Sequence, residues 1–279
     1  MQQTKKFGYL RQKRLYFIFQ GLDMASIFSD HSSDITSDNT IRITSTNCPY
    51  NSACEGCSSR HISLCNVLDS NELKSLSQIS TDFRKNAKQV ICSEDEDANY
   101  LYNIRSGAVR ISKMLSDGRR QITGFLFAGD FLGLSCKDRY SYTAEAITEV
   151  DLCRFSRTKI MSSFRDFPKL GERVFDMTRT ELEATHAQML LLGRKTAKEK
   201  LCSFLLNMKE KSSRQQGSPE NEIDLPMSRS DIADFLGLTV ETISRQFTNL
   251  HKMGLIDLDG AHKVILKDSE TLAALAEGD

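Results

Sequence analysis

Residues 228–254 read SRSDIADFLGLTVETISRQFTNLHKMG, and this stretch decides the fold of the C-terminal part of the chain. Apolar residues recur at helical spacing on both sides of Gly237, where a glycine allows the positive φ of a tight turn. Ser228 and Thr239 occupy N-cap positions, because their hydroxyls can accept hydrogen bonds from the free backbone N–H groups of a first helical turn. Two short capped helices around one turn predict a helix-turn-helix.

Each of the two helices has one apolar face. The expected buried faces are Ile232, Ala233 and Leu236 in the first helix, and Val240, Ile243 and Phe247 in the second. Ala233 is small at the point where the second helix must cross closely. Apolar runs at 255–257 and 264–266 follow, separated by polar residues, and they predict a β-hairpin that makes the motif winged.

Four polar residues share the outer face near the start of the second helix: Glu241, Thr242, Ser244 and Arg245. This is the end of a recognition helix that enters the major groove, where arginine can read guanine and glutamate can accept from cytosine. Arg229, at the start of the first helix, adds a cation. The alternative is that Glu241 and Arg245, four residues apart, form only a surface ion pair. The full apolar pattern with its wing favours binding to double-stranded DNA.

The rest of the chain predicts strands first and helices last. Between about residues 88 and 157, runs rich in β-branched and aromatic residues alternate with glycine-containing turns, which is typical of an antiparallel barrel or sandwich. The runs are 90–91, 100–104, 108–112, 121–127, 144–147 and 150–155. With the C-terminal helices they predict an α+β fold.

A long segment between Pro168 and Gly193 has the apolar periodicity of one helix stripe. The stripe consists of Val174, Met177, Leu182, Thr185, Met189 and Leu192. It could pack on its own domain, or it could form a coiled coil with a second copy of the chain. Spacing alone leaves both interpretations open.

The composition excludes several classes of protein. The chain has 37 Lys and Arg against 37 Asp and Glu, so DNA contact would depend on a few placed cations rather than on a basic excess. No run of about 18 apolar residues exists, so we expect no membrane partner and a cytoplasmic location. The apolar run Leu15–Phe19 is too short for an export signal. Whether translation begins at Met24 stays open.

The eight cysteines are unevenly placed. Four of them, Cys48, Cys54, Cys57 and Cys65, lie within eighteen residues, and Cys54 with Cys57 forms a C-x2-C step. Soft thiolates at such spacing can hold zinc or an iron–sulfur cluster, and these four could close a zinc site by themselves.

The other cysteines call for different interpretations. Cys92 and Cys202 have apolar neighbours and should fill the core, whereas Cys136 lies in a polar loop. Disulfides are not expected in a reducing cytoplasm.

Several stretches resemble the CRP/FNR superfamily of bacterial regulators, over about residues 65–275. They are IRSGAVR (104–110), SDGRRQITG (116–124), AGDFLG (128–133), MLLLGRK (189–195) and LGLTVETISR (236–245). The last is specific to the FNR branch, and the chain is similar to its rhizobial FnrN and FixK members. The resemblance implies a cyclic-nucleotide-binding-like β-roll, a long dimerisation helix and a winged helix-turn-helix.

On this basis we expect five segments. They are a disordered extension 1–47, a cysteine-rich cluster-binding segment 48–68, a β-roll sensor domain 69–165, a dimerisation helix 166–193 and a winged DNA-binding domain 194–279. FNR-like proteins hold a 4Fe–4S cluster with N-terminal cysteines and one distant cysteine on a late strand.

The cluster ligands that this resemblance implies are Cys54, Cys57, Cys65 and Cys153, with Cys48 a spare thiol. Matching the enteric pattern without gaps puts the fourth ligand at Asp151, but an offset of two residues keeps Cys153 on the same strand face. Zinc in place of iron–sulfur, or direct thiol redox chemistry, is the alternative for a regulator of the same fold.

The resemblance also argues against a cyclic nucleotide. The family's ribose-binding Gly-Glu pair reads Gly133-Leu134 here, and no Arg-Ser or Arg-Thr step follows before Ala144. A buried phosphate without its cation would be costly.

The function implied is an oxygen-responsive transcription activator rather than an enzyme, because no nucleophile–base arrangement, P-loop or HExxH motif occurs. The chain would act as a homodimer on a palindrome like TTGAT-N4-ATCAA. Its targets would be genes of microaerobic or anaerobic metabolism, with nitrogen fixation as one candidate. Ser116–Arg119 would lie among the surfaces that contact RNA polymerase. A family aspartate that keeps the apo form monomeric aligns with His186, so whether oxygen acts by monomerisation stays open.

Overall fold

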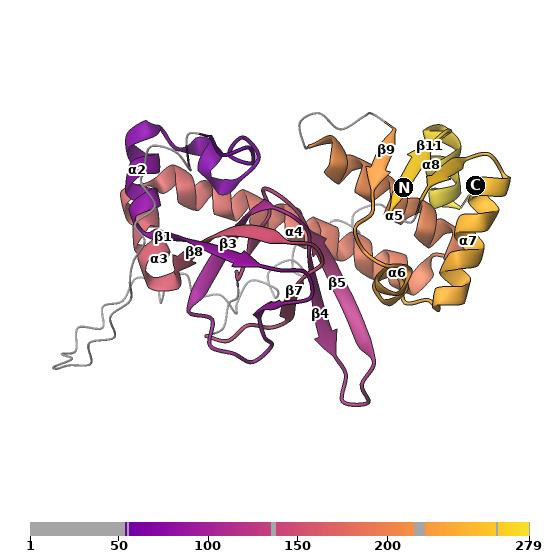
Figure 1. Ribbon diagram of the computed structural model, residues 1–279, viewed down its shortest axis with the longest axis horizontal. Coiled ribbons are helices and arrows are strands. Elements are labelled where there is room, and N and C mark those ends of the chain that lie inside the picture. The colour runs from indigo at the N-terminus through magenta and orange to yellow at the C-terminus, as the bar shows by residue number, and fades with distance from the viewer. Residues whose placement is uncertain (1–53, 55, 135–137, 215–220, 261, 279) are drawn as a thin grey trace, which may run out of the picture. The chain divides into compact units, whose positions relative to one another are not determined.

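The computed structural model describes residues 54, 56–134, 138–214, 221–260 and 262–278 (Figure 1). The expected disordered extension 1–47, with Met24, lies outside the described residues, and so do Cys48 and Cys136. Among the helices of the described ranges, none combines the length and the apolarity needed to cross a membrane.

Two four-stranded antiparallel sheets form the first part of the fold, which we call the roll (residues 80–156). One sheet has the order β1-β8-β3-β6 and the other β2-β7-β4-β5. The strands are β1 Ser80–Lys85, β2 Val90–Cys92, β3 Tyr100–Ser106, β4 Val109–Met114, β5 Arg120–Leu126, β6 Phe131–Leu132, β7 Thr143–Ala146 and β8 Val150–Ser156. All six runs predicted from the sequence are strands.

Two strands of the roll were not predicted, and each has a physical reason. β1 reads STDFRK and is mostly polar because it is an edge strand that pairs only with β8. β6 has two residues and exists through its pairing with β3. Neither strand has an alternating apolar pattern of its own.

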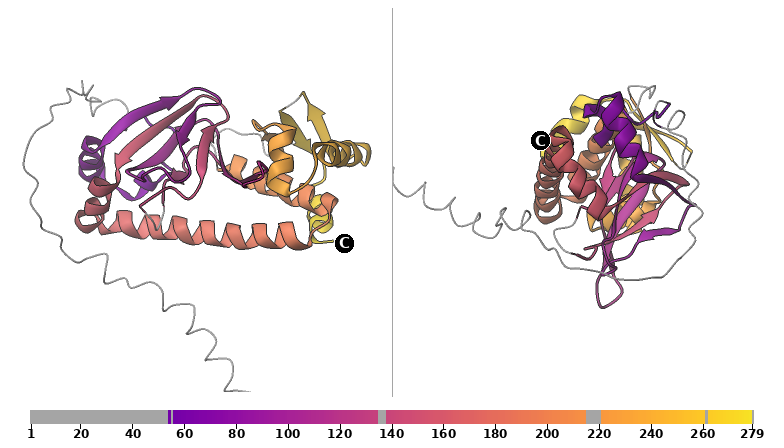
Figure 2. Two further views of the ribbon diagram at one scale, coloured as in Figure 1. Left: turned by 90° about the horizontal axis from the view of Figure 1, so that it is seen from below. Right: turned by 90° about the vertical axis from the view of Figure 1, so that its left-hand side faces the viewer.

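Helices stand before and after the roll in the chain. They are the 3-10 helix η2 Leu64–Val67, then α2 Ser70–Gln78, α3 Arg157–Asp166 and α4 Pro168–Arg194. Asp69 starts α2 with a capping box, in which its carboxylate accepts from two backbone N–H groups and Glu72 reaches back. Figure 2 shows α4 running beside the roll as one continuous helix of 27 residues.

The C-terminal part, which we call the head (residues 197–277), contains the predicted helix-turn-helix. Its elements are α5 Ala197–Ser213, β9 Glu222–Asp224, α6 Arg229–Leu236, α7 Val240–Lys252, β10 Ile256–Asp259, β11 Lys263–Leu266 and α8 Ser269–Glu277. The predicted wing is β10–β11, and β9 adds a third strand beside β11. Thr196 ends the helical run from α4, because its side chain caps α5 in a box with Glu199.

The head and the roll share apolar packing within one compact unit. Ile122 and Phe125 of β5 belong to the same buried cluster as Phe204 of α5 and Leu236 of α6. The rings of Phe125 and Phe204 lie 6.3 Å apart in an edge-to-face arrangement. A second cluster fills the roll, and a third lies between β8, η2, α2 and α4.

Two turn glycines of the roll share a positive φ but differ in their surroundings. Gly107 has φ +88° and Gly118 has φ +86°. A Cβ on Gly107 would collide with the carbonyl oxygen of Glu149 and lie 2.7 Å from Cγ1 of Val150, whereas one on Gly118 would meet nothing within 4 Å.

Gly118→Ala should therefore lower the free energy of unfolding by about 1–2 kcal/mol, the cost of a left-handed non-glycine residue. Gly107→Ala should lower it by about 3 kcal/mol or more, because the collision adds to the same strain. Urea denaturation of both variants measures the difference. Equal losses would contradict the importance of this close approach.

Candidate nucleic-acid interface and thiol site

Local hydrogen bonds set the two helices of the motif. Ser228 Oγ accepts from the backbone N–H of Asp231 at 3.1 Å, and the Asp231 carboxylate accepts from the backbone N–H of Ser228 at 3.1 Å. Gly237 has φ +62° in the turn, as expected. Thr239 Oγ1 accepts from the N–H of Thr242 at 3.2 Å and starts α7. The N-cap predictions are confirmed.

The predicted buried faces are correct except at one position. Five of the six residues are at most 2% exposed: Ile232, Ala233, Leu236, Ile243 and Phe247. Val240, however, is 40% exposed, and its assignment to the core was wrong. It is the first residue of α7, and the buried face of the helix begins three residues later, at Ile243. Leu250, which is fully buried, extends the apolar face at the other end.

The four residues expected to contact DNA bases, which we call the reading residues, lie together at the start of α7. Glu241, Ser244 and Arg245 are exposed and Thr242 is half-buried. Ser244 Oγ donates to the carbonyl oxygen of Val240 at 2.9 Å. The pKa of Glu241 is lowered, chiefly by its own backbone N–H at the helix start and then by Thr239 and the nearby Arg245 cation. A charged carboxylate and a guanidinium are thus presented to solvent from one helix end.

Arg229 is placed differently from these four. Its guanidinium carbon lies 3.3 Å from the centroid of the Phe247 ring, so it stacks where α6 crosses α7. Burial lowers the pKa of this guanidinium. Arg229 therefore braces the two helices, and its contact with DNA stays a prediction.

The predicted stripe of α4 divides into a packed and an open part. Val174 is 8% exposed and Met177 packs against the third apolar cluster, whereas Leu182 is 55% and Met189 67% exposed. Phe175, which the sequence interpretation missed, is 65% exposed. Its position seven residues before Leu182 was the available signal. We call Phe175, Leu182 and Met189 the open stripe.

Four cysteines gather beside β8, and we call Cys54, Cys57, Cys65 and Cys153 the thiol site. Cys54, Cys65 and Cys153 pack against the cluster that contains Leu64 and Phe155. Cys57 Sγ lies 3.4 Å from Ser59 Oγ. The sheet therefore brings Cys153 to the segment that carries the C-x2-C step. Cys92 and Cys202 are buried elsewhere, at 2% and 0% exposure, as predicted for core residues.

Burial and mutual repulsion shape the chemistry of these thiols. The pKa of Cys153 is raised to about 12, mainly by burial, with Cys65, Cys54 and Cys57 adding to the rise and Arg105 opposing it. The pKa of Cys65 is also raised to about 12, again mainly by burial, and Ser63 opposes the rise. A soft metal centre would relieve this repulsion, because it binds thiolates together.

The donor set fits zinc or an iron–sulfur cluster in kind, but the thiols are not closed into a ligand set. Among the described residues, no three His, Cys, Asp or Glu side chains stand close enough together to hold a metal ion. Cys54 and Cys57 lie in a segment of turns, so bringing them toward Cys153 requires no break in a strand or an α-helix.

Asp151 and Cys153 have different partners although both lie on β8. Asp151 forms an ion pair with Arg84, on the neighbouring edge strand β1. Cys153 lies opposite Asp82 on one side and Asn103 on the other. The alternative fourth position is therefore occupied by an ion-paired carboxylate.

The apolar core of the roll includes tyrosines beside its aliphatic residues. Tyr102 and Tyr140 are 4% and 3% exposed. Tyr140 Oη donates to the carbonyl oxygen of Tyr100 at 2.7 Å, and Tyr142 Oη accepts from the backbone N–H of Gly133 at 3.1 Å. Burial raises the pKa of Tyr142. Tyr142 thus contacts the backbone at Gly133, the position at which cyclic-nucleotide-binding relatives have their ribose-binding Gly-Glu pair.

Comparisons with known proteins agree with both parts of the fold. Residues 199–275 match the Crp-like helix-turn-helix domain and residues 83–166 match the cyclic nucleotide-binding domain. The transcriptional activatory protein AadR of Rhodopseudomonas palustris is 38% identical over 79% of this chain and 95% of its own length. The activator FnrL of Cereibacter sphaeroides is 35% identical over 81% and 92%.

A solved structure, that of FixK2 from Bradyrhizobium japonicum, is 38% identical and superposes with a TM-score of 0.66 over 71% of this chain and 97% of that one. These relatives confirm the α+β fold with a cyclic-nucleotide-binding-like roll and a helix-turn-helix, and they are regulators rather than enzymes. The chain belongs to the CRP/FNR family of DNA-binding transcription regulators.

Proposed function

We propose that this regulator is a cytoplasmic, oxygen-responsive activator. Its thiol site would hold a 4Fe–4S cluster that controls dimerisation and binding to a TTGAT-N4-ATCAA-like palindrome. The observation that carries the proposal is the gathering of Cys54, Cys57 and Cys65 around Cys153, a residue of a different element almost ninety positions along the chain. When bound, the cluster would supply an oxygen-labile tie between these elements.

The segment that carries Cys57 and Cys65 also contacts the helix that carries the open stripe. Arg173 of α4 donates from Nη2 to the carbonyl oxygen of Ile62 at 3.3 Å, and Ile62 lies just before η2 in the chain. Leu170 of α4 belongs to the same apolar cluster as Leu64. Ordering of the cysteine segment would therefore act on α4 directly. Zinc on the same thiols would order the segment equally well but would give no response to oxygen.

Regulators of this family bind DNA as dimers, and the open stripe supports α4 as the surface. Three large apolar side chains seven residues apart, each more than half exposed, are the pattern of a two-stranded coiled coil. A dimer would place two α7 helices about 34 Å apart on a palindrome. The contact of Tyr142 with the backbone at Gly133 supports the absence of a cyclic nucleotide from this mechanism.

Activation would require contact with RNA polymerase, and the β4–β5 turn is the candidate surface. Arg119 pairs with Asp117 at 2.8 Å within the turn, and both side chains are more than half exposed. Met114 and Leu115 beside them are 62% and 48% exposed.

Leu182→Glu should weaken the dimer by about 30-fold, because each copy would bring a carboxylate into an apolar seam at the level of a hot-spot loss. Sedimentation equilibrium measures the dissociation constant. Thr180→Glu, which adds the same charge to an exposed position on the far side of α4, is the control. Equal effects of the two variants would remove the open stripe as the dimer surface.

Arg245→Ala should cost about 1–3 kcal/mol of binding to the palindrome and should relax the choice of base at one guanine in each half-site. Fluorescence anisotropy with matched and single-base-changed duplexes measures both. Lys252→Ala removes the same charge from the opposite end of α7 and should leave base preference unchanged. A loss that is equal on all sequences would make Arg245 a phosphate contact.

Purified without oxygen, the wild-type protein should be brown, should contain about four iron and four sulfide per monomer, and should lose colour and DNA affinity in air. Cys153→Ser should lose the iron, because it removes the ligand that the sheet supplies. Cys92→Ser, the same change at a buried thiol outside the site, should keep it. A colourless wild-type protein with stoichiometric zinc would overturn the proposal in favour of the zinc alternative.

A further inference from the structure

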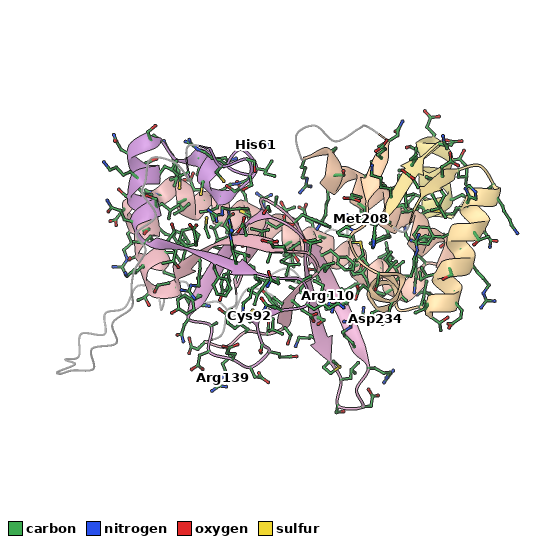
Figure 3. All side chains as sticks on the ribbon, viewed as in Figure 1. His61, Cys92, Arg110, Arg139, Met208 and Asp234 are labelled. Carbon is green, nitrogen blue, oxygen red and sulfur yellow. The ribbon has the colours of Figure 1, made fainter. Side chains whose placement is uncertain are left out.

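The first helix of the motif, α6, is held by charges from the roll. Arg110 of β4 donates to Asp231 Oδ1 at 2.8 Å, and Arg120 of β5 donates to the same oxygen at 2.9 Å. Arg120 also donates to Asp234 Oδ2 from Nε at 2.9 Å and from Nη2 at 2.7 Å. Figure 3 labels Arg110 and Asp234 at this junction. The Asp231 side chain is only 4% exposed, so water screens these pairs weakly.

The other end of α6 is held by amide and ammonium groups. Its last carbonyl oxygens lack partners within the helix, as at every helix C-terminus. Gln121 of β5 donates to the carbonyl oxygen of Asp234 at 2.7 Å, and Gln188 of α4 donates to that of Phe235 at 2.9 Å. Lys200 of α5 donates to that of Leu236 at 3.2 Å. The roll, the long helix and α5 therefore all bind the segment just before the turn of the motif.

The face of α7 that carries the reading residues stays exposed to solvent while α6 is held in this way. Glu241, Ser244 and Arg245 are exposed on α7, and the contacts from the roll go to α6 instead. The held arrangement is therefore compatible with DNA binding. It is also the arrangement in which each head has a fixed direction relative to the helix that carries the open stripe.

We propose that Arg110 and Arg120 are positioning residues for DNA binding, which fix the head on the sensor roll by holding Asp231 and Asp234 of α6. A palindrome is read only when two heads stand at one spacing, so a head free to rotate would pay an ordering cost on each binding event. Removing the Arg120 guanidinium would also leave Asp234 without its ion-pair partner and the buried Asp231 with one guanidinium in place of two, which favours other orientations of the head. The inference rests on the family's DNA binding and holds whether the thiols take iron or zinc.

Substitutions at Arg120 and Asp234 test the head–roll contact without disturbing the cap of α6. Asp231 is unsuitable because it also takes part in that cap through Ser228. Arg119 is the matched control: it neighbours Arg120, its side chain is 76% exposed, and it pairs with Asp117 inside the same turn. The full-length dimer is used throughout, without oxygen. The probe is the palindrome that the wild-type protein selects from random duplexes, together with its single half-site and a version with two added central base pairs.

Arg120→Gln should lower affinity for the palindrome about tenfold, the size of a typical coupling between two sites, with little change on the half-site. It should also reduce the preference for the correct spacing, a ratio that a loss of stability alone would not change. Asp234→Asn should act in the same direction, and Arg120→Lys should recover part of the affinity. Arg119→Gln should match the wild type in DNA affinity and in spacing preference, the two quantities measured here.

Thermal unfolding of each variant shows that it is folded, and Asp234→Asn carries the test if Arg120→Gln is not. Unchanged affinity and spacing preference in both variants would overturn the proposal. So would an equal loss on half-site and palindrome, which would make the contact a general support of the head. A gain in affinity would overturn it too, because the contact would then restrain the head from DNA.

Discussion

The arrangement of the roll and the head depends on the Asp231 carboxylate. One oxygen accepts from the backbone N–H and the hydroxyl of Ser228, which begins α6. The other accepts from two guanidiniums of neighbouring strands in the roll. The same side chain thus begins a helix and joins two domains. Moving α6 away from the roll would remove both guanidiniums from the buried Asp231 carboxylate and would leave Arg110 with Glu145 as its partner in the roll. This arrangement is therefore specified more strongly than apolar contacts alone would specify it.

Local chemistry made much of the fold predictable. The caps, Gly237 and the apolar spacing of residues 228–254 each act within one turn or between adjacent helices, and the sequence interpretation placed both helices correctly. The strands of the roll were found because each run is apolar in its own right. β1 was missed because an edge strand needs few apolar residues, and its place comes from pairing with β8. Val240 was misplaced because spacing alone does not show where the neighbouring helix ends.

The same distinction between local and long-range contacts decides how much of each candidate site could be predicted. The C-x2-C step is a local signal, but the position of Cys153 beside it depends on the register of β8 against β1 and β3. Resemblance to a family named Cys153 as a candidate, and no spacing rule could have done so. Arg110 and Arg120 lie in stretches that were singled out only as resemblances. Their partner Asp231 is more than a hundred residues away, so nothing near them in the chain indicates a contact between domains.

The chain has equal numbers of basic and acidic residues, and several of its arginines have partners within the chain. Arg110 and Arg120 are cations of the head–roll junction, turned toward carboxylates of the same chain rather than toward phosphates. Arg229 stacks on Phe247, which leaves Arg245 as the exposed cation among the proposed reading residues. A DNA-binding protein that makes few phosphate contacts gains little affinity from counterion release. If Glu241 and Arg245 read bases as proposed, the affinity would come from base contacts made by two heads together, and such contacts require the heads to be held in place.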